Sequence, residues 1–210
     1  MVGIPAVVLV FLAWLGRDVV SLLPPTLALA IVASGLVNLG IATAYERGYG
    51  VLKRLGGAPL GRSGLLTAKL TVVILIAIAQ VIALIALALV LGWRPTLLTS
   101  WLVVAVASVV GSAAFAALGL LLAGALRPEA ALVLANALFL VAILLGGVLV
   151  PIADLPGPLA TIAGLLPSGA LADVFDRALI GHGDVVQPLA VLAAWAVIAF
   201  ASAARAFRWD

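Results

Sequence analysis

The sequence contains no cysteine, a single histidine and few charged residues. Without cysteine the chain has no disulfide and no thiolate-bound metal. Only 9% of its 210 residues are charged, against about 25% in ordinary soluble domains. Hydrophobic residues make up 66% of the chain, which is more apolar surface than a soluble fold of this length could bury. The composition predicts an all-α integral membrane protein, and we treat residues 1–210 as a single transmembrane domain.

Motifs for catalysis and nucleotide binding are also absent. The G-x-x-x-x-G-K-[ST] pattern that cradles phosphates does not occur, and the pair Gly56-Gly57 has no lysine after it. His182 lies between two glycines, which favours a solvated loop residue over a metal ligand. We therefore predict no catalytic residue, no metal site and no cofactor within this chain.

Six hydrophobic stretches are candidates for spanning helices, each of which needs about 20 mostly apolar residues. They cover roughly 1–15, 25–45, 66–92, 98–126, 130–150 and 186–204. The first is short and lacks the basic start of a signal peptide. We interpret it as the latter part of a first span whose beginning is missing or differently placed. The sequence thus predicts six spans.

The charges sort to two sides of these spans. Three of the eleven cations lie on one side, together with most of the aspartates, and the other eight lie opposite: Arg47, Lys53, Arg54, Arg62, Lys69, Arg127, Arg205 and Arg208. Cytoplasmic loops carry an excess of lysine and arginine, so both termini are predicted to be cytoplasmic. This topology explains the net charge of +3 better than nucleic-acid binding does.

The one long segment on the exterior side covers about 151–185. Prolines interrupt it, yet leucines and alanines keep its first half too apolar for water and too short to cross a bilayer. A short re-entrant or interfacial helix pair, with its irregular backbone buried in protein, fits this pattern. The residues assigned to this exterior re-entrant segment are Pro151, Leu155, Pro156, Pro167 and Arg177.

The most charged segment is 45–70. On a helical wheel its first part places the apolar residues Tyr45, Tyr49, Val51, Leu52 and Leu55 opposite the charged residues Glu46, Arg47, Lys53 and Arg54. This predicts an amphipathic cytoplasmic helix over about 45–60. Such a helix could lie on anionic lipid or sit in a groove of another protein, and the pattern alone leaves both readings open.

Polar side chains within hydrocarbon are costly and each invites a functional hypothesis. Ser34 and Asn38 share a face of the second span, and Asn136 lies in the fifth; we assign them to a substrate path or a dimer seam. For Gln80, Ser108 and Ser112 we favour interhelical hydrogen bonds, worth about 0.6 kcal/mol each. The near absence of charge within the spans predicts a path for amphiphilic or apolar cargo.

Two segments carry a family resemblance. The first is Tyr45-Glu46-Arg47, Gly50, Leu52-Lys53-Arg54-Leu55, Ala58-Pro59-Leu60 and Lys69-Leu70. It resembles the cytoplasmic segment E-R-x-x-G-T-L-[KE]-x-L-x-x-[TA]-P of ABC-2-type transporter permeases. The second is Leu155-Pro156-Gly157-Pro158-Leu159, Leu166-Pro167, Asp176-Arg177-Ala178-Leu179 and Gly181. It is similar to that family's L-P-x-W-L…P-x-x-Y…R…G region before the last span.

The resemblance implies a permease subunit of an ATP-driven exporter in a bacterial cell membrane. ATP and Mg would then bind to a partner ATPase subunit, and a second permease copy or paralogue would complete the transporter. It also implies that the cytoplasmic helix contacts the ATPase through Glu46, Arg47, Lys53, Arg54 and Arg62. The alternatives are a non-transporting membrane scaffold protein and a membrane-embedded lipid-modifying enzyme.

Overall fold

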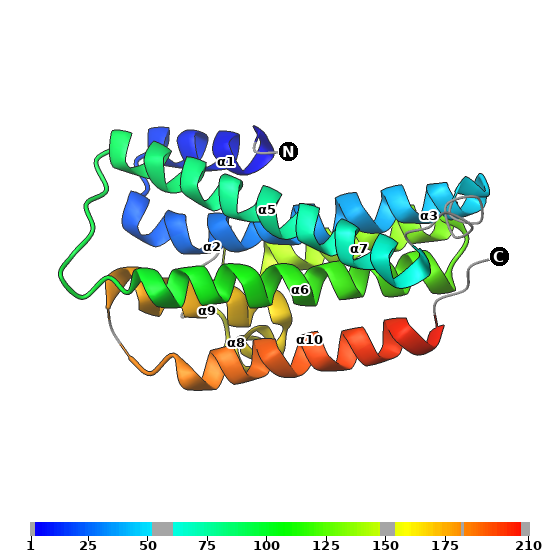
Figure 1. Cartoon of the computed structure of the whole chain (residues 1–210). Helices are drawn as coiled ribbons and strands as arrows, with labels where there is room; N and C mark the ends of the chain where they lie inside the picture. The colour runs from blue at the N-terminus through cyan, green and yellow to red at the C-terminus, as the bar shows by residue number, and fades with distance from the viewer. Residues whose placement is uncertain (1–2, 52–60, 148–153, 182, 207–210) are drawn as a thin grey trace.

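The computed structural model describes residues 3–51, 61–147, 154–181 and 183–206, and these residues form helices joined by short connections, with no strand among them. The long helices run lengthwise, side by side (Figure 1). Five are long and apolar enough to cross a membrane: Val19–Gly48, Thr67–Val90, Trp101–Ala125, Pro128–Leu145 and Val186–Arg205. The prediction of an all-α membrane protein is confirmed.

The first of these spans is built from three consecutive segments, α2 (Val19–Val32), the π-helix η1 (Ala33–Leu39) and α3 (Gly40–Gly48). It begins six residues before the predicted start because the Asp18 side chain accepts a hydrogen bond from the backbone N–H of Val20 and caps the helix. Pro24 and Pro25 lie within α2 without ending it, as proline can where neighbouring helices enclose the backbone.

The end of α3 differs from the sequence prediction. Tyr45–Gly48 continue the span instead of starting a separate amphipathic helix, and Tyr49 caps α3. Gly50 then takes a left-handed conformation with φ of 70°, which breaks the helix. The rest of the predicted amphipathic helix, 52–60, lies outside the described residues.

The other spans are α5 (Gly61–Val90), α6 (Trp101–Ala125), α7 (Pro128–Leu145) and α10 (Val186–Ala206). All four overlap their predicted ranges. Helix α7 begins at Pro128 because the fixed φ of proline suits the first helical position. The first predicted span corresponds to α1 (Gly3–Trp14), whose 12 residues are too few to cross a bilayer. Figure 1 places its N-terminal end about halfway along the bundle.

Between α7 and α10 lie two short helices, α8 (Gly157–Leu165) and α9 (Pro167–Ile180), bent by 89° relative to each other. The bend follows from Pro167, which cannot donate a backbone hydrogen bond and holds Leu166 extended with ψ of 145°. Gly169 permits the tight turn, because a Cβ there would lie 1.9 Å from the Ala163 carbonyl oxygen. This pair is the helical segment predicted before the last span.

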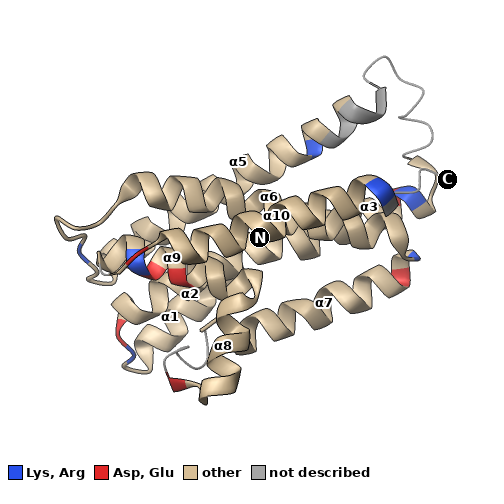
Figure 2. Cartoon of the chain, turned by 90° about the horizontal axis from the view of Figure 1, so that it is seen from below, with Lys and Arg blue, Asp and Glu red and all other residues tan. Residues whose placement is uncertain are grey.

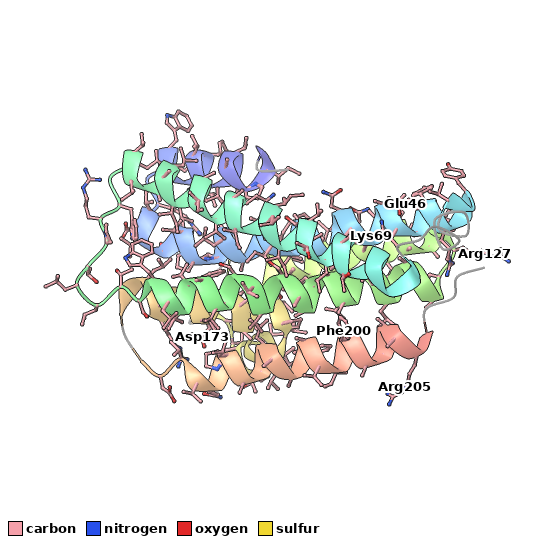
Figure 3. The ribbon with its side chains drawn as sticks, in the orientation of Figure 1. Glu46, Lys69, Arg127, Asp173, Phe200 and Arg205 are labelled. Atoms are coloured by element: carbon pink, nitrogen blue, oxygen red, sulfur yellow. The ribbon has the colours of Figure 1, made fainter. Side chains whose placement is uncertain are left out.

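The two ends of the bundle differ in charge (Figure 2). The basic end is defined by Arg47, Lys69, Arg127 and Arg205, with Glu46 and Glu129 beside them. The acidic end carries Asp18, Asp154, Asp173, Asp176 and Asp184, with three arginines. Figure 3 shows Glu46, Lys69 and Arg127 at one end and Asp173 towards the other.

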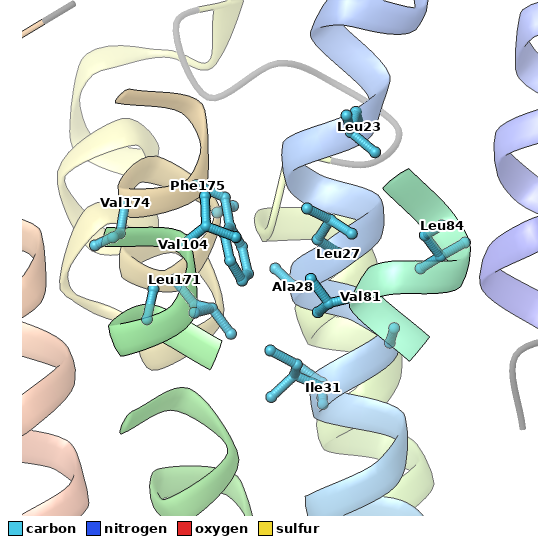
Figure 4. Close-up of a cluster of buried hydrophobic side chains, with 14 of the residues drawn as sticks. Leu23, Leu27, Ala28, Ile31, Val81, Leu84, Val104, Leu171, Val174 and Phe175 are labelled. Atoms are coloured by element: carbon cyan, nitrogen blue, oxygen red, sulfur yellow. The ribbon is translucent and has the colours of Figure 1, made fainter. Parts of the chain in front are cut away.

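The apolar core lies towards the acidic end, between α2, α5, α6 and α9 (Figure 4). Its largest fully buried side chains include Leu23, Leu27, Leu84, Leu171 and Phe175. Helix α2 is therefore central, whereas most residues of α7 and α10 are exposed or only partly buried. Because these two helices are apolar, their outer faces are suited to lipid or to another membrane helix.

Candidate functional site

At the basic end, the last two turns of α3 are tied to α5 by charge. The Lys69 ammonium lies 2.5 Å from Glu46 Oε2 and also donates to Thr43 Oγ1 at 3.3 Å. Thr43 is fully buried and the Lys69 side chain is only 15% exposed. Partial burial reduces the screening of such a pair by water, so this contact fixes α3 against α5 more firmly than an exposed pair would.

Arg47 ties α3 to α6 in the same region. Its guanidinium donates to the carbonyl oxygens of Gly124 and Leu126. These residues lie at the end of α6, where the last four carbonyls of a helix have no partner within the helix. Arg47 therefore caps α6 and also complements the negative end of its dipole.

Gly48 brings α3 against the start of α7. A Cβ at position 48 would lie 2.7 Å from Pro128 Cγ, so the glycine allows this close approach. Within six residues, 43–48, α3 is thus joined to α5, α6 and α7. We call this set the α3 clamp: Thr43, Glu46, Arg47 and Gly48, with Lys69, Gly124, Leu126 and Pro128 as their partners.

Two residues predicted for ATPase contact, Glu46 and Arg47, belong to the α3 clamp. Arg62 lies in the first turn of α5, whereas Lys53 and Arg54 fall outside the described residues. Lys69 was assigned to the basic side and to the family motif but not to the ATPase contact, and Thr43 was not predicted as a site residue. The spacing of Thr43, Glu46 and Arg47 on one helix could have indicated a polar face turned towards other helices.

In the middle of the bundle, Ser34 of η1 contacts Gln80 of α5. The Ser34 hydroxyl lies 2.6 Å from Gln80 Oε1 and 2.8 Å from the carbonyl oxygen of Ala30. Both side chains are buried, and Gln80 Nε2 has no hydrogen-bond partner among the described residues. The interhelical bond predicted for Gln80 is confirmed. Ser34 itself faces another helix of the same chain.

The other polar residues of the spans behave differently. Ser108 and Ser112 donate to carbonyls of their own helix, Val104 at 2.7 Å and Ser108 at 2.6 Å. The prediction of interhelical bonds was wrong for them, because a buried serine can satisfy its hydroxyl within one turn of its own helix. Asn38 is half-buried in η1. Asn136 is exposed on α7 and donates to Leu132 at 2.8 Å.

The residues predicted for the exterior re-entrant segment belong to the α8–α9 pair or directly precede it, apart from Pro151, which lies outside the described residues. Leu155 and Pro156 precede α8, and Pro156 caps it. Arg177 in the last turn of α9 donates to both carboxylate oxygens of Asp173, each at 2.7 Å. The hydrogen bond to Asp173 raises the pKa of Arg177 further, with the nearby carboxylates of Asp184 and Asp176 adding to the effect, so the guanidinium stays charged.

The loop between α5 and α6 holds the end of α9 in place. The backbone N–H of Ser100 donates to the Ala178 carbonyl at 2.8 Å, and Thr99 Oγ1 donates to that of Leu179 at 3.0 Å. On α10, Trp195 donates to the Leu165 carbonyl at 2.9 Å, at the bend between α8 and α9. The pair is therefore anchored at its bend and at its outer end.

No group of three or more His, Cys, Asp or Glu side chains that could hold a metal ion occurs in the described part of the chain. In a comparison with protein families, the model described as "ABC-2 family transporter protein" matches residues 16–205. Comparisons with curated proteins and with solved structures gave no match. The family match covers all five spanning helices, the α3 clamp and the bent helix pair, and the chain therefore belongs to the ABC-2 transporter family as one of its membrane permease components.

Proposed function

We propose that this chain is the permease subunit of an ATP-driven exporter in a bacterial cell membrane. It would move an amphiphilic or hydrophobic molecule out of the cytoplasm, with ATP hydrolysed in a separate subunit that binds at the basic end. The observation that carries the proposal is the α3 clamp. It joins the helix that precedes segment 52–60 to α5, α6 and α7, so a push on that segment would move several spans together.

The residues proposed for the ATPase contact have two different roles in this arrangement. Glu46 and Arg47 have partners within the chain, so they would fix the base of the contact surface. Lys53, Arg54 and Arg62 would supply the charges that meet the ATPase, because Lys53 and Arg54 follow α3 in the sequence and Arg62 lies in the first turn of α5. The excess of cations at the basic end supports a cytoplasmic position for this surface.

A second permease copy or paralogue would complete the transporter. Asn136 supports an interface between the two permease subunits at α7. An exposed amide in an otherwise apolar spanning helix gains a hydrogen-bond partner when it packs against another helix. Asn38 lies half-buried in the first long span, and we propose that it borders the substrate path. Ser34, which packs against Gln80, would hold the span that carries this path.

The test uses the permease co-expressed with its ATPase and purified in detergent. The double charge reversal Lys53→Glu/Arg54→Glu should reduce co-purification of the ATPase while leaving membrane insertion intact. Arg47→Ala should retain the ATPase but uncouple it, because α3 would no longer be tied to α6. Arg127→Ala is the matched control, since Arg127 is exposed at the same end.

The measurements are the amount of ATPase recovered and the rate of ATP hydrolysis in the complex. Full recovery and unchanged hydrolysis in the double reversal would refute the assignment of the contact surface. If no ATPase co-purifies with the unaltered permease, the scaffold alternative is favoured over an exporter.

A further inference from the structure

A cavity of about 530 Å³ lies at the acidic end, between the start of α2, the end of α7, α8 and α9. Small-molecule sites in proteins have volumes of about 300–1,000 Å³. The cavity contains none of the α3 clamp residues and lies at the opposite end of the bundle. We call it the acidic-end cavity.

The walls of the acidic-end cavity are of two kinds. Small and apolar residues form one part, including Pro24 and Pro25 of α2, Gly146 after α7, and Ala160 and Gly164 of α8. Charged residues form the other part: Asp18, Asp173, Asp176 and Arg177. An apolar surface facing ionised groups is suited to a molecule that has both an apolar body and a charge.

The sign of that charge follows from the lining residues. Three carboxylates and one guanidinium give a formal balance of −2. The guanidinium of Arg177 already donates to both oxygens of Asp173 and to the Asp184 carbonyl, so little of its charge remains to attract an anion. Asp18 and Asp176 add two further carboxylates to the same wall. The cavity therefore favours a cation.

We infer that the acidic-end cavity binds an amphiphilic cation, with its charge beside Asp18 and Asp176 and its apolar body against α2 and α8. The apolar wall excludes water from one side of the charge, which strengthens its attraction to the carboxylates. The inference rests on the proposed function only in identifying this ligand with exported cargo. Binding itself requires no ATP.

The test measures binding of tetraphenylphosphonium to the permease–ATPase complex in nanodiscs of zwitterionic phosphatidylcholine, by equilibrium dialysis against empty nanodiscs. Tetraphenylborate, which has nearly the same shape and the opposite charge, is the matched probe. We expect saturable binding of the cation above the lipid background and weaker binding of the anion.

Two variants remove charge at the same end of the bundle. Asp18→Asn/Asp176→Asn neutralises the two carboxylates, and asparagine caps a helix as well as aspartate does, so α2 keeps its start. We expect the dissociation constant of tetraphenylphosphonium to rise about tenfold, the factor that about 1.4 kcal/mol produces. Asp154→Asn is the control, because Asp154 is exposed at the acidic end and is not among the lining residues.

A second pair of variants changes volume instead of charge. A Cβ at Gly164 meets no atom within 4 Å and Gly164 lines the cavity, so Gly164→Leu adds volume at the cavity wall and should weaken or abolish saturable binding. Gly157→Leu is its control on the same helix, because a Cβ there also meets open space and Gly157 does not line the cavity.

Three results would overturn the inference. They are no saturable binding to the unaltered complex, tetraphenylborate bound as tightly as the cation, or unchanged binding of the cation by both Asp18→Asn/Asp176→Asn and Gly164→Leu. Recovery of the ATPase from the same preparation reports separately on the proposed function. If the ATPase is recovered and the cation does not bind, the cavity inference alone fails. If no ATPase is recovered, the proposed function fails, and the dialysis is repeated on the permease alone to decide the cavity inference.

Discussion

Ser34 and Gln80 form a buried polar contact that leaves one group unpaired. The single hydroxyl hydrogen of Ser34 has two acceptors, Gln80 Oε1 and the Ala30 carbonyl, and cannot fully satisfy both. Gln80 Nε2 is buried and has no partner among the described residues. Such an unpaired donor costs about 1–3 kcal/mol. The Gln80 amide therefore gives the fold little net stability.

This imbalance predicts that two substitutions at one contact have unequal effects. Gln80→Leu removes the unpaired amide together with its bond, so the free energy of unfolding should change by less than about 1 kcal/mol. Ser34→Ala leaves the whole amide of Gln80 unpaired and should lower the free energy of unfolding by about 1–2 kcal/mol. Denaturation of the purified protein in detergent, followed by circular dichroism, measures both.

Ser108→Ala is the matched control for this comparison. Ser108 is buried to a similar degree, but its hydroxyl bonds only within its own helix, so its loss should have a smaller effect than that of Ser34. A larger loss of stability for Gln80→Leu than for Ser34→Ala would contradict the prediction, because it would mean that the amide is fully paired in the membrane protein.

Among the helices, hydrophobic length was sufficient to predict α5, α6, α7 and α10, because each is a continuous apolar run of spanning length. It was not sufficient for the span Val19–Gly48. The predicted start at residue 25 came too late, and the cap at Asp18 and the enclosing helices explain the earlier one. The π-helix η1 could not be predicted, since a wider helical turn has no hydrophobic period of its own in so short a segment.

Two residues of the α3 clamp could be predicted from the sequence, but the residues that they contact on other helices could not. The sequence placed Glu46 and Arg47 at one end of the protein, and the structure agrees. Their partners come from 23 residues away for Glu46 and from 77 and 79 residues away for Arg47. A helical wheel describes one helix at a time, so it could not show that these charges face other spans.

The crossing of η1 and α6 depends on glycine. A Cβ at Gly119 would lie 2.4 Å from the Gly35 carbonyl oxygen, and backbone cannot move aside as a flexible side chain can. Gly119→Ala should therefore lower the melting temperature and the yield of monodisperse protein, although alanine favours a helix over glycine by about 1 kcal/mol. Thermal unfolding followed by size-exclusion chromatography measures both quantities.

The sign of the effect separates packing from helix propensity. Gly157→Ala on α8 is the control, because a Cβ there meets nothing within 4 Å, and it should be neutral or slightly stabilising. A neutral Gly119→Ala would contradict a crossing of η1 and α6 that depends on glycine at this position.

Considered as one body, the protein has a basic end and an acidic end, and the positive-inside rule predicts that the basic end is cytoplasmic. The absence of native cysteine allows single introduced thiols to report on this. Leu97→Cys, at a fully exposed position in the loop between α5 and α6 at the acidic end, should react with an impermeant maleimide in intact cells. Arg127→Cys, exposed at the basic end, should react only after the cells are opened. The reverse pattern would invert the proposed direction of transport.

The outer face of α7 is a suitable place for a second copy to pack. Val133, Leu134, Leu138 and Leu140 are exposed on this helix, and Asn136 lies among them. An apolar face alone is equally suited to lipid. The amide makes the difference, because the Asn136 side chain retains hydrogen-bonding capacity beyond its bond to Leu132, and hydrocarbon offers no partner for it.

Placing α7 at a two-fold seam predicts a specific cross-link. Identical residues meet only where they lie close to the symmetry axis, so Asn136→Cys should form a disulfide-linked dimer when membranes are treated with a mild oxidant. Val197→Cys on α10 is the matched control, because Val197 is 68% exposed in another apolar spanning helix and should stay monomeric. The measurement is non-reducing electrophoresis of membranes from cells that express each variant. Cross-linking at 197 without cross-linking at 136 would move the seam to α10, and cross-linking at both to similar extents would indicate random collision in the bilayer instead of a specific interface.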